Sequence, residues 1–456
     1  MLKGWTWCWG FAFLAVVLSN APVSWGATGR EAQLEQTVEM LLKRVEALES
    51  KIDSMAGTAS TTSDLEERLA RVEASKSSGD FKVFWNKGIN FQTEDKAFSL
   101  KLGGRAQTDW YWGSYDDGDF ENGVRFRRAR LSLGGTIYED IDFKWEYDFA
   151  EKGDAKWRDV FMAYHGIDFV TIKIGQFHEP IGLEEITSDN DISMIERSPA
   201  ITAFVPSRQT GIMLYNYDLL DKRLGLAAGY FYTVNDYGDG DENDAKNGDY
   251  DLTARIYGLP WFEDEGAKLL HLGAAYSHRE WDGDDAQFRS RGSWSKGDYL
   301  VDTDKFAAED SDLFGAEAAV VFGPASLQGE YLLNSVDGAE DVDDADFQGF
   351  YVQAGYFLTG EHRGYSGGIF KAPSIKENFS LKEGGAGAWE VTARYSYLDL
   401  DDGDVQGGQL DDVAVGLNWY LNPNTKVMAN YAHAEEDGDG AGDEGDVFTM
   451  RFQLAF

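Results

Sequence analysis

The amino-acid sequence predicts an all-β protein: a 16-stranded antiparallel transmembrane β-barrel, preceded by a short α-helical coiled-coil segment. Two observations predict the barrel. Apolar and polar residues alternate along about 16 segments of roughly ten residues each. The connections between these segments switch between long acidic stretches and short turns. The last ten residues, VFTMRFQLAF, keep the alternation up to the C-terminal phenylalanine, as a final lipid-facing strand would.

Residues 1–26 have the pattern of a cleaved signal peptide. Lys3 stands near the start, an apolar run extends from Phe11 to Leu18, and small residues follow up to Gly26. The alternative is a transmembrane anchor, but the run is much shorter than the ~20 residues that a spanning helix needs. The single cysteine, Cys8, lies in this segment. The mature chain is therefore expected to be exported and to contain no disulfide.

Residues 27–77 are predicted to form a periplasmic coiled-coil segment and linker. Apolar residues recur at two positions of a heptad, Leu34, Leu41, Leu48 and Met55 at one and Val38, Val45 and Ile52 at the other. One alternative is a single amphipathic helix packed on the barrel. The narrow apolar seam and its charged flanks favour an oligomerising coiled coil instead.

Residues 78–456 are predicted to form the barrel. In IDFKWEYDF, apolar residues from Ile141 to Phe149 alternate with Asp142, Lys144, Glu146 and Asp148. A soluble β-sandwich would also alternate, but aromatic residues gathered near strand ends are typical of the two membrane interfaces. Counted along the chain from the first strand, most odd-numbered connections are long and acidic, for example NDYGDGDENDAKNGD and LDDGDVQGGQLDD. Most even-numbered connections are short, for example YED, HGID, FGPA and LNPN. Two connections break this rule, the short EKGDA and the long stretch 360–385.

The composition argues against several functions. A net charge of −39 excludes nucleic-acid binding as the main role. The six histidines stand in no recognisable catalytic motif, so an enzyme is not expected. The acidic stretches 236–244 and 435–446 suggest calcium, but neither has the spacing of a twelve-residue calcium loop. They are interpreted as solvated loops, and no cofactor is expected.

Several stretches resemble the phosphate-selective porins of the O/P type. They are FRRARLSLGGTIYEDIDFKWEYDFAE (126–151), GQFHEPIGLEEITSDNDISMIERSPAITAFVPSRQTG (175–211), YVQAGYFLTGEHRGY (351–365), GAWEVTARYSYLDL (387–400) and VGLNWYLNPNTKVMANY (415–431). The resemblance implies a homotrimer in the outer membrane of a Gram-negative bacterium, in contact with its lipid. It also implies passive diffusion of small inorganic or organic ions, above all anions such as phosphate. The amino-terminal segment would lie in the periplasm.

The predicted inner wall carries a basic track. If apolar residues face lipid, the following side chains point inward: Arg105, Arg128, Arg130, Lys144, Lys173, Arg255, Arg394 and Arg451. One interpretation is that they draw anions through a water-filled lumen. The other is that they pair with inward acids such as Asp142, Glu146 and Glu390.

In porins of this type the third loop folds into the pore. The matching loop begins after Gly175 and extends to about Arg208, and its candidate constriction residues are His178, Glu179, Pro180, Glu184, Glu185, Arg197 and Arg208. Family members supply lysines here, whereas this loop is acidic. An acidic constriction would repel phosphate. The sequence therefore predicts an outer-membrane pore for small hydrophilic solutes without strong phosphate selectivity.

The alternative is a structural envelope tether that contacts the cell wall through the coiled coil. A tether with a plugged barrel would show no ion conductance.

Overall fold

The computed structural model describes residues 39, 42–47, 81–116, 120–150, 156–232, 250–281, 285–339, 342–437 and 444–456. The chain divides into two compact units, Met1–Gly79 and Asp80–Phe456. In the first unit, Glu39 and residues 42–47 are α-helical, and Lys43 forms an ion pair with Glu39 at 3.3 Å. The predicted signal peptide and the rest of the predicted coiled-coil segment lie outside the described residues. No helix in the described part of the chain is long and apolar enough to span a bilayer.

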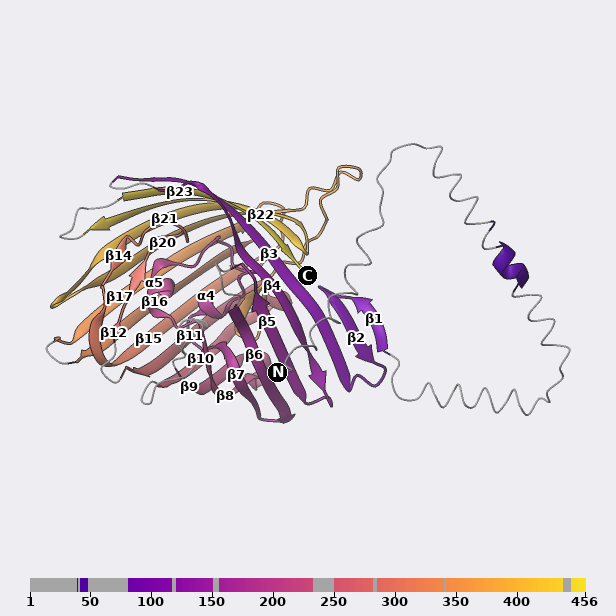
Figure 1. Ribbon diagram of the computed structural model, residues 1–456, viewed down its shortest axis with the longest axis horizontal. Coiled ribbons are helices and arrows are strands. Elements are labelled where there is room, and N and C mark those ends of the chain that lie inside the picture. The colour runs from indigo at the N-terminus through magenta and orange to yellow at the C-terminus, as the bar shows by residue number, and fades with distance from the viewer. Residues whose placement is uncertain are drawn as a thin grey trace, which may run out of the picture. The chain divides into compact units, whose positions relative to one another are not determined.

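The second unit is a closed barrel of sixteen antiparallel strands, in which each strand pairs with the next and the last pairs with the first (Figure 1). The strands are β3 (Phe98–Tyr115), β4 (Gly123–Ile137), β5 (Ile141–Asp148), β6 (Lys156–Ile167), β7 (Val170–His178), β8 (Arg208–Asp218), β9 (Leu224–Tyr232), β10 (Tyr250–Glu263), β11 (Lys268–Glu280), β15 (Phe306–Phe322), β16 (Ala325–Gly338), β17 (Ala345–Phe357), β20 (Ala388–Asp402), β21 (Val405–Asn422), β22 (Thr425–Asp437) and β23 (Glu444–Ala455). The predicted strand number and closure are confirmed.

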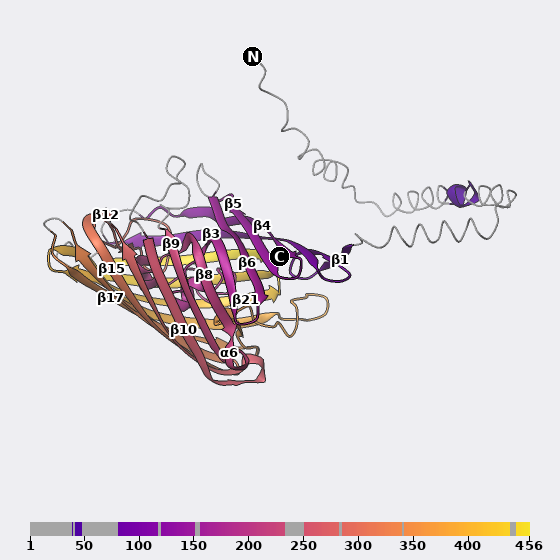
Figure 2. The ribbon, with the colours of Figure 1, turned by 90° about the horizontal axis from the view of Figure 1, so that it is seen from below.

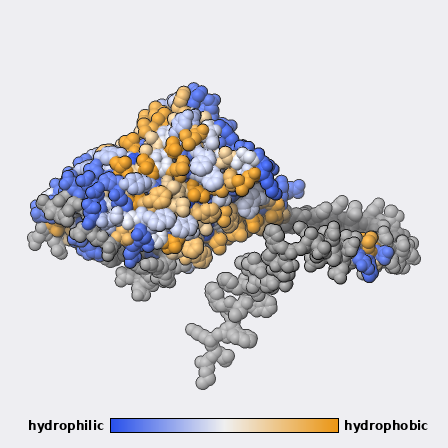
Figure 3. All heavy atoms as spheres, turned by 90° about the horizontal axis from the view of Figure 1, so that it is seen from above, coloured by the Kyte–Doolittle hydropathy of each residue, from blue (hydrophilic) through white to orange (hydrophobic). Residues whose placement is uncertain are grey.

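The last strand shows why the alternation continues to the C-terminus. Phe448, Phe452 and Leu454 are exposed on the outer face, whereas Thr449 and Arg451 are buried inside. The strand pairs with β3, and backbone hydrogen bonds between Phe456 and Gly104 continue this seam. Apolar residues gather across the middle of the visible barrel face, with hydrophilic residues toward its ends (Figure 3). Lipid contact explains that band, because apolar side chains are stable on a surface that faces the apolar interior of a bilayer.

The two ends of the barrel differ, but not every stretch predicted to be a long acidic loop is one. One end has tight turns such as 138–140, 168–169, 323–324 and 423–424, together with the short helices α6 (Leu219–Lys222) and η2 (Asp264–Gly266). The stretch LDDGDVQGGQLDD was predicted to be a long loop at the other end. This prediction is wrong, because β20 and β21 pair through most of it and leave only residues 403–404 as the connection.

A short hairpin extends the sheet at the turn end. Strands β1 (Phe81–Trp85) and β2 (Ile89–Thr93) pair with each other, and β2 pairs with the first residues of β3. The ring of Trp85 stacks on that of Phe456, with centroids 6.2 Å apart. This hairpin therefore packs against the seam where the barrel closes.

Three connections fold into the barrel interior. Residues 179–207 carry α4 (Leu183–Ile186) and α5 (Pro199–Phe204), and residues 285–305 carry β12 (Asp285–Ala286), β13 (Arg289–Ser290) and β14 (Val301–Asp302). The third is the exceptional stretch 358–387, which enters from the turn end with the hairpin of β18 (Gly364–Ser366) and β19 (Ile369–Lys371). Arg255 on β10 donates to the carbonyl of Gly368 at 2.9 Å, and Tyr365 lies 2.6 Å from His271 on β11. The hairpin is thus fixed to the inner wall.

Candidate functional site: the barrel interior

The eight residues of the predicted basic track all lie on the inner face of the wall, and seven form ion pairs with described carboxylates. The pairs are Arg105–Glu146 (3.4 Å), Arg128–Asp189 (2.9 Å), Arg130–Asp148 (2.6 Å), Lys144–Glu146 (3.3 Å), Arg255–Glu317 (2.6 Å), Arg394–Glu184 (2.9 Å) and Arg451–Asp109 (2.6 Å). The exception is Lys173, which forms no ion pair or hydrogen bond with the described residues. The predicted partner Glu146 is present, but most partners come from the third loop or from other inward positions.

The third loop, residues 179–207, is held against several sides of the barrel. On β16, Glu330 accepts hydrogen bonds from the backbone N–H groups of Leu183 (2.6 Å) and Glu184 (2.8 Å). On β21, Asn418 donates to the carbonyl of Ser193 at 2.7 Å. Buried polar groups are costly to leave unpaired, so these contacts fix the loop inside the lumen. Two of the predicted loop residues belong to the strands that flank the loop. His178 is the last residue of β7 and Arg208 is the first of β8, and the two stand opposite each other in the register of these strands.

Asp189 is the centre of the charge cluster between loop and wall. Its carboxylate lies 2.8 Å from Arg197 of the loop and within 3.5 Å of Arg105, Arg128 and Arg130 of the wall. Burial alone would raise the pKa of Asp189, but these guanidinium groups hold it well below its ordinary value. The carboxylate is therefore ionised and compensated at neutral pH.

A β-bulge adds an arginine that the alternation did not predict. In the pairing of β3 with β4, Gln107 faces Arg128 while Thr108 faces Phe126, so Arg127 is an additional residue. Arg127 consequently also points inward and forms an ion pair with Glu196 of the loop at 2.9 Å, and Arg451 reaches the same carboxylate at 2.7 Å. Sequence reasoning missed Arg127 because a strict period of two assigns it to the lipid face, and it also missed the loop partner Glu196.

The other predicted loop residues lie in the same network. Glu185 contacts both Arg197 (2.8 Å) and His178 (3.1 Å). Burial opposes the charge of Glu185, but Arg197 and then His178 lower its pKa below the ordinary value. Glu179 accepts a hydrogen bond from Thr253 on β10, and Arg208 pairs with Asp159 at 2.8 Å.

The loop is rich in carboxylates, as predicted, but it does not present them as free negative charge. Glu184, Glu185, Asp189 and Glu196 all have arginine partners. The expectation of an acidic constriction that repels anions is therefore revised, since the charges of loop and wall largely compensate one another.

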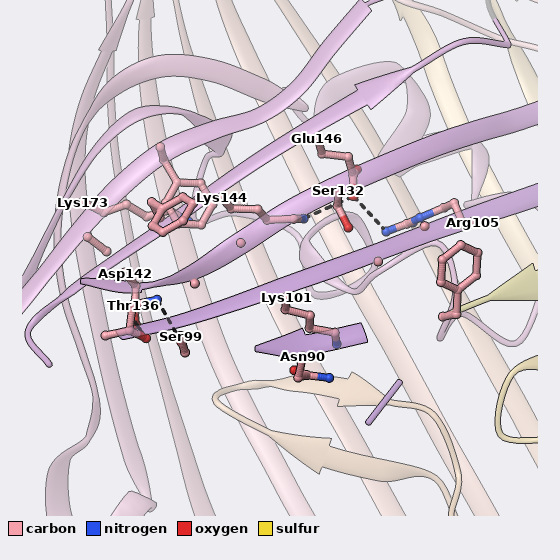
Figure 4. A pocket seen from close by; sticks show the side chains of 18 of the residues that line it. Asn90, Ser99, Lys101, Arg105, Ser132, Thr136, Asp142, Lys144, Glu146 and Lys173 are labelled. Carbon is pink, nitrogen blue, oxygen red and sulfur yellow. Dashed lines mark hydrogen bonds and ion pairs between the residues drawn. The ribbon is translucent and has the colours of Figure 1, made fainter. Parts of the chain in front are cut away.

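Next to this cluster, and sharing Arg105 and Asp189 with it, the interior carries lysines with few carboxylate partners. Two cavities of about 630 and 510 Å³ share Lys144 and Lys173 in their lining; the first adds Lys101 and the second adds Lys371. We call these two cavities together the lysine chamber. Figure 4 shows the first cavity, where Lys144 and Arg105 both approach Glu146 while Lys101 and Lys173 make no marked contact with the residues drawn.

Three of these lysines occupy the same position in their strands. Lys101, Lys144 and Lys173 are each the fourth residue of their strands β3, β5 and β7, counted from the turn end. Lys371 comes from the inward hairpin instead. Lys101, Lys173 and Lys371 form no ion pair or hydrogen bond within the described part of the chain, although Lys371 still feels the charge of Asp191. Lys101 could have been found from its inward position, whereas nothing in the sequence indicated that Lys371 enters the barrel.

Comparison with known proteins places this barrel in a family. The model of the family described as phosphate-selective porin O and P matches residues 65–456. Porin O of Pseudomonas aeruginosa is 30% identical over 413 residues, which cover 81% of this chain and 91% of that protein. An uncharacterized protein of Caulobacter vibrioides is 26% identical over 89% of this chain and 85% of its own length.

Solved structures agree on the fold. OmpT, an outer membrane protein of Vibrio cholerae, has a TM-score of 0.51 at 12% identity and covers 79% of this chain and 98% of its own. OmpF of Salmonella typhi, solved with daunomycin, has a TM-score of 0.50 at 16% identity and covers 82% of this chain and all of its own. The chain belongs to the phosphate-selective porin O and P family. Family and fold together indicate a channel for small solutes, rather than an enzyme, in the outer membrane of a Gram-negative bacterium.

Proposed function

We propose that this protein is a passive outer-membrane pore that prefers small anions, phosphate among them, and that the lysine chamber sets this preference. The observation that carries the proposal is the set of Lys101, Lys173 and Lys371, which line the chamber without a salt-bridge partner among the described residues. Uncompensated ammonium groups in a confined, low-dielectric surround attract anions more strongly than paired ones do.

The arginine–carboxylate cluster has a different role in this proposal. Its charges cancel at close range, so it fixes the third loop and narrows the lumen without strongly selecting the sign of the solute. The high negative charge of the whole chain lies mainly in the acidic connections, and salt screens exposed charges beyond about 8–10 Å. An anion that has passed the loop therefore experiences mainly the chamber.

Phosphate fits the chamber by chemistry. A lysine ammonium is a compact point charge with three N–H donors, and several such groups around one cavity can share the oxygens of an oxyanion. Because Lys144 already pairs with Glu146 and Asp159, its contribution is weaker than that of the unpaired lysines. We infer moderate phosphate binding supplied by wall and hairpin lysines, in place of the strong selectivity that loop lysines give in the family.

Assembly and placement follow from the family resemblance. We propose a homotrimer in contact with outer-membrane lipid, with residues 27–77 on the periplasmic side. The broad apolar outer face supports lipid contact, and the tight turns are assigned to the periplasmic end.

The test is single-channel recording of the full chain in planar bilayers across a salt gradient. Anion selectivity, with partial block of chloride current by phosphate, supports the proposal. Cation selectivity would contradict the proposal and would indicate that the acidic connections determine the ion selectivity. Folded trimers that conduct no ions would instead favour the envelope-tether function.

A further inference from the structure

Part of the inner wall that lines the lysine chamber has aromatic side chains at inward positions where other strands have charged side chains. Phe161 on β6, Phe177 on β7, and Tyr215 and Tyr217 on β8 all line the second cavity; we call them the aromatic patch. These strands lie side by side in the wall (Figure 2). On β5, by contrast, the inward positions are Asp142, Lys144, Glu146 and Asp148. A wall that needed only to be polar would not require four neighbouring rings.

The patch is not fully hidden in the wall, and third-loop residues such as Pro180 and Ile186 line the same cavity. Phe177 is buried against Phe231 and Met213, whereas Phe161, Tyr215 and Tyr217 are only half-buried. Partly exposed rings around a cavity are the usual lining of sites for organic ligands, in which a few polar groups fix the orientation.

Charge and rings meet at Lys173. Its ammonium lies 3.9 Å from the ring centroid of Phe161 and 4.3 Å from that of Phe177. The ring faces carry partial negative charge and hold the ammonium in the absence of a carboxylate partner. One point of the cavity therefore offers both a cation and aromatic surface.

We propose that the lysine chamber binds aromatic anions, that is, a single ring bearing a carboxylate or phosphate group. The anionic group contacts Lys144, Lys173 and Lys371, and the ring packs against Phe161, Tyr215 and Tyr217. This inference rests on the proposed anion preference and deepens it by naming the solute class. The 510 Å³ cavity has room for a molecule of this size.

The contacts change in a consistent way when such a solute enters. The anionic group takes over the Lys173 ammonium, which leaves the face of Phe161 free. The positive edge of the incoming ring can then approach that face in an edge-to-face arrangement. An aliphatic acid of the same charge would bind the lysines but gain no ring contact.

The experiment compares block of chloride current by benzoate and by acetate in single channels of the full chain. We expect benzoate to block about tenfold more tightly than acetate, because ring contacts add to the shared ionic term. The double variant F161L/Y215L keeps apolar bulk but removes two rings, and should reduce the preference for benzoate over acetate to less than about threefold. The matched control F231L alters the buried part of the same cluster without touching the cavity, and should keep the preference.

Several outcomes would overturn the inference. Equal block by benzoate and acetate would do so, as would equal loss of preference in F231L and F161L/Y215L. If the double variant fails to fold, block by benzoate and by cyclohexanecarboxylate can be compared in the unaltered protein. Equal block by these two acids would show that the aromatic character of the ring is not recognised. Cation selectivity measured with potassium chloride alone, before any organic acid is added, would refute the proposed function itself. That outcome is therefore distinguishable from failure of the aromatic-anion inference alone.

Discussion

The arginine–carboxylate cluster and the lysine chamber lie in the same barrel and contain the same kinds of charged groups, yet they differ in how those charges are paired. Around Asp189, the loop carboxylates Glu184, Asp189 and Glu196 meet guanidinium groups of the wall, and Glu185 meets Arg197 of the loop. In the chamber, Lys101, Lys173 and Lys371 have no such partner among the described residues. The comparison teaches that counting charges along a loop does not give the charge that a solute meets. What matters is which charges remain uncompensated after folding.

The largest expected effect is a loss of stability caused by a substitution in the arginine–carboxylate cluster. Replacing Arg451 by Met leaves the buried carboxylate of Asp109 without its ion-pair partner and removes one of the two arginines that contact Glu196. Loss of one member of a buried ion pair costs about 3–5 kcal/mol, so the free energy of unfolding should fall by that amount. Urea unfolding of the barrel in lipid vesicles measures it.

An exposed ion pair supplies the control. Lys268 pairs with Asp264 at 2.9 Å on the turn end, and a pair of this kind contributes less than about 1 kcal/mol. K268M should therefore leave unfolding almost unchanged. If R451M proved as mild as K268M, the cluster would not be the structural element proposed here.

The next effect concerns selectivity and the uncompensated region. Changing Lys101, Lys173 and Lys371 together to Gln removes three positive charges but leaves hydrogen-bonding side chains. The ratio of chloride to potassium permeability should fall about tenfold, and the reversal potential in a salt gradient measures it.

Two comparisons make this result specific. The variant K305Q, at an exposed residue paired with Asp285, should not change the permeability ratio. D189N removes a compensated charge and should shift the ratio less than the triple change does. A larger shift from D189N would reverse the assignment of roles between the two regions.

A smaller effect should follow from pH. Burial lowers the pKa of Lys371, and the positive charges of Lys87 and Lys144 lower it further despite the opposing effect of Asp191. Lys371 therefore loses its charge as pH rises through a value below that of an ordinary lysine. Anion preference should weaken over that alkaline range, and K371Q should make this step smaller in a plot of reversal potential against pH.

The smallest effect tests how the hairpin holds Lys371 in place. Y365F removes the hydroxyl that lies 2.6 Å from His271. The lost hydrogen bond should cost about 0.5–1.5 kcal/mol and loosen the hairpin of β18 and β19. Single-channel current noise should increase while the mean conductance stays similar; unchanged noise would show that other contacts suffice to hold the hairpin.

Much of the barrel could be predicted from the sequence because lipid and lumen impose opposite demands on alternate residues. Arg394 and Arg451 were assigned inward on that basis alone. The bulge at Arg127 could not be predicted, because one additional residue changes the face without changing the composition. The inward hairpin carrying Lys371 was visible only as an unexpectedly long turn. Charge pairing across the lumen was also out of reach, since Asp189 and its wall partners come from distant parts of the chain and meet only in the closed barrel.

The position of the wall lysines has a consequence for how such a channel can change over evolution. Lys101, Lys144 and Lys173 are each counted from the tight-turn end of their strands, at the fourth residue. Their height in the membrane is therefore tied to the turns and is independent of the connections at the opposite end. Those acidic connections can lengthen, shorten or exchange residues under pressure from the cell's surroundings without displacing the lysines. The lysines that we propose to select the solute and the acidic connections are thereby separated along the barrel axis.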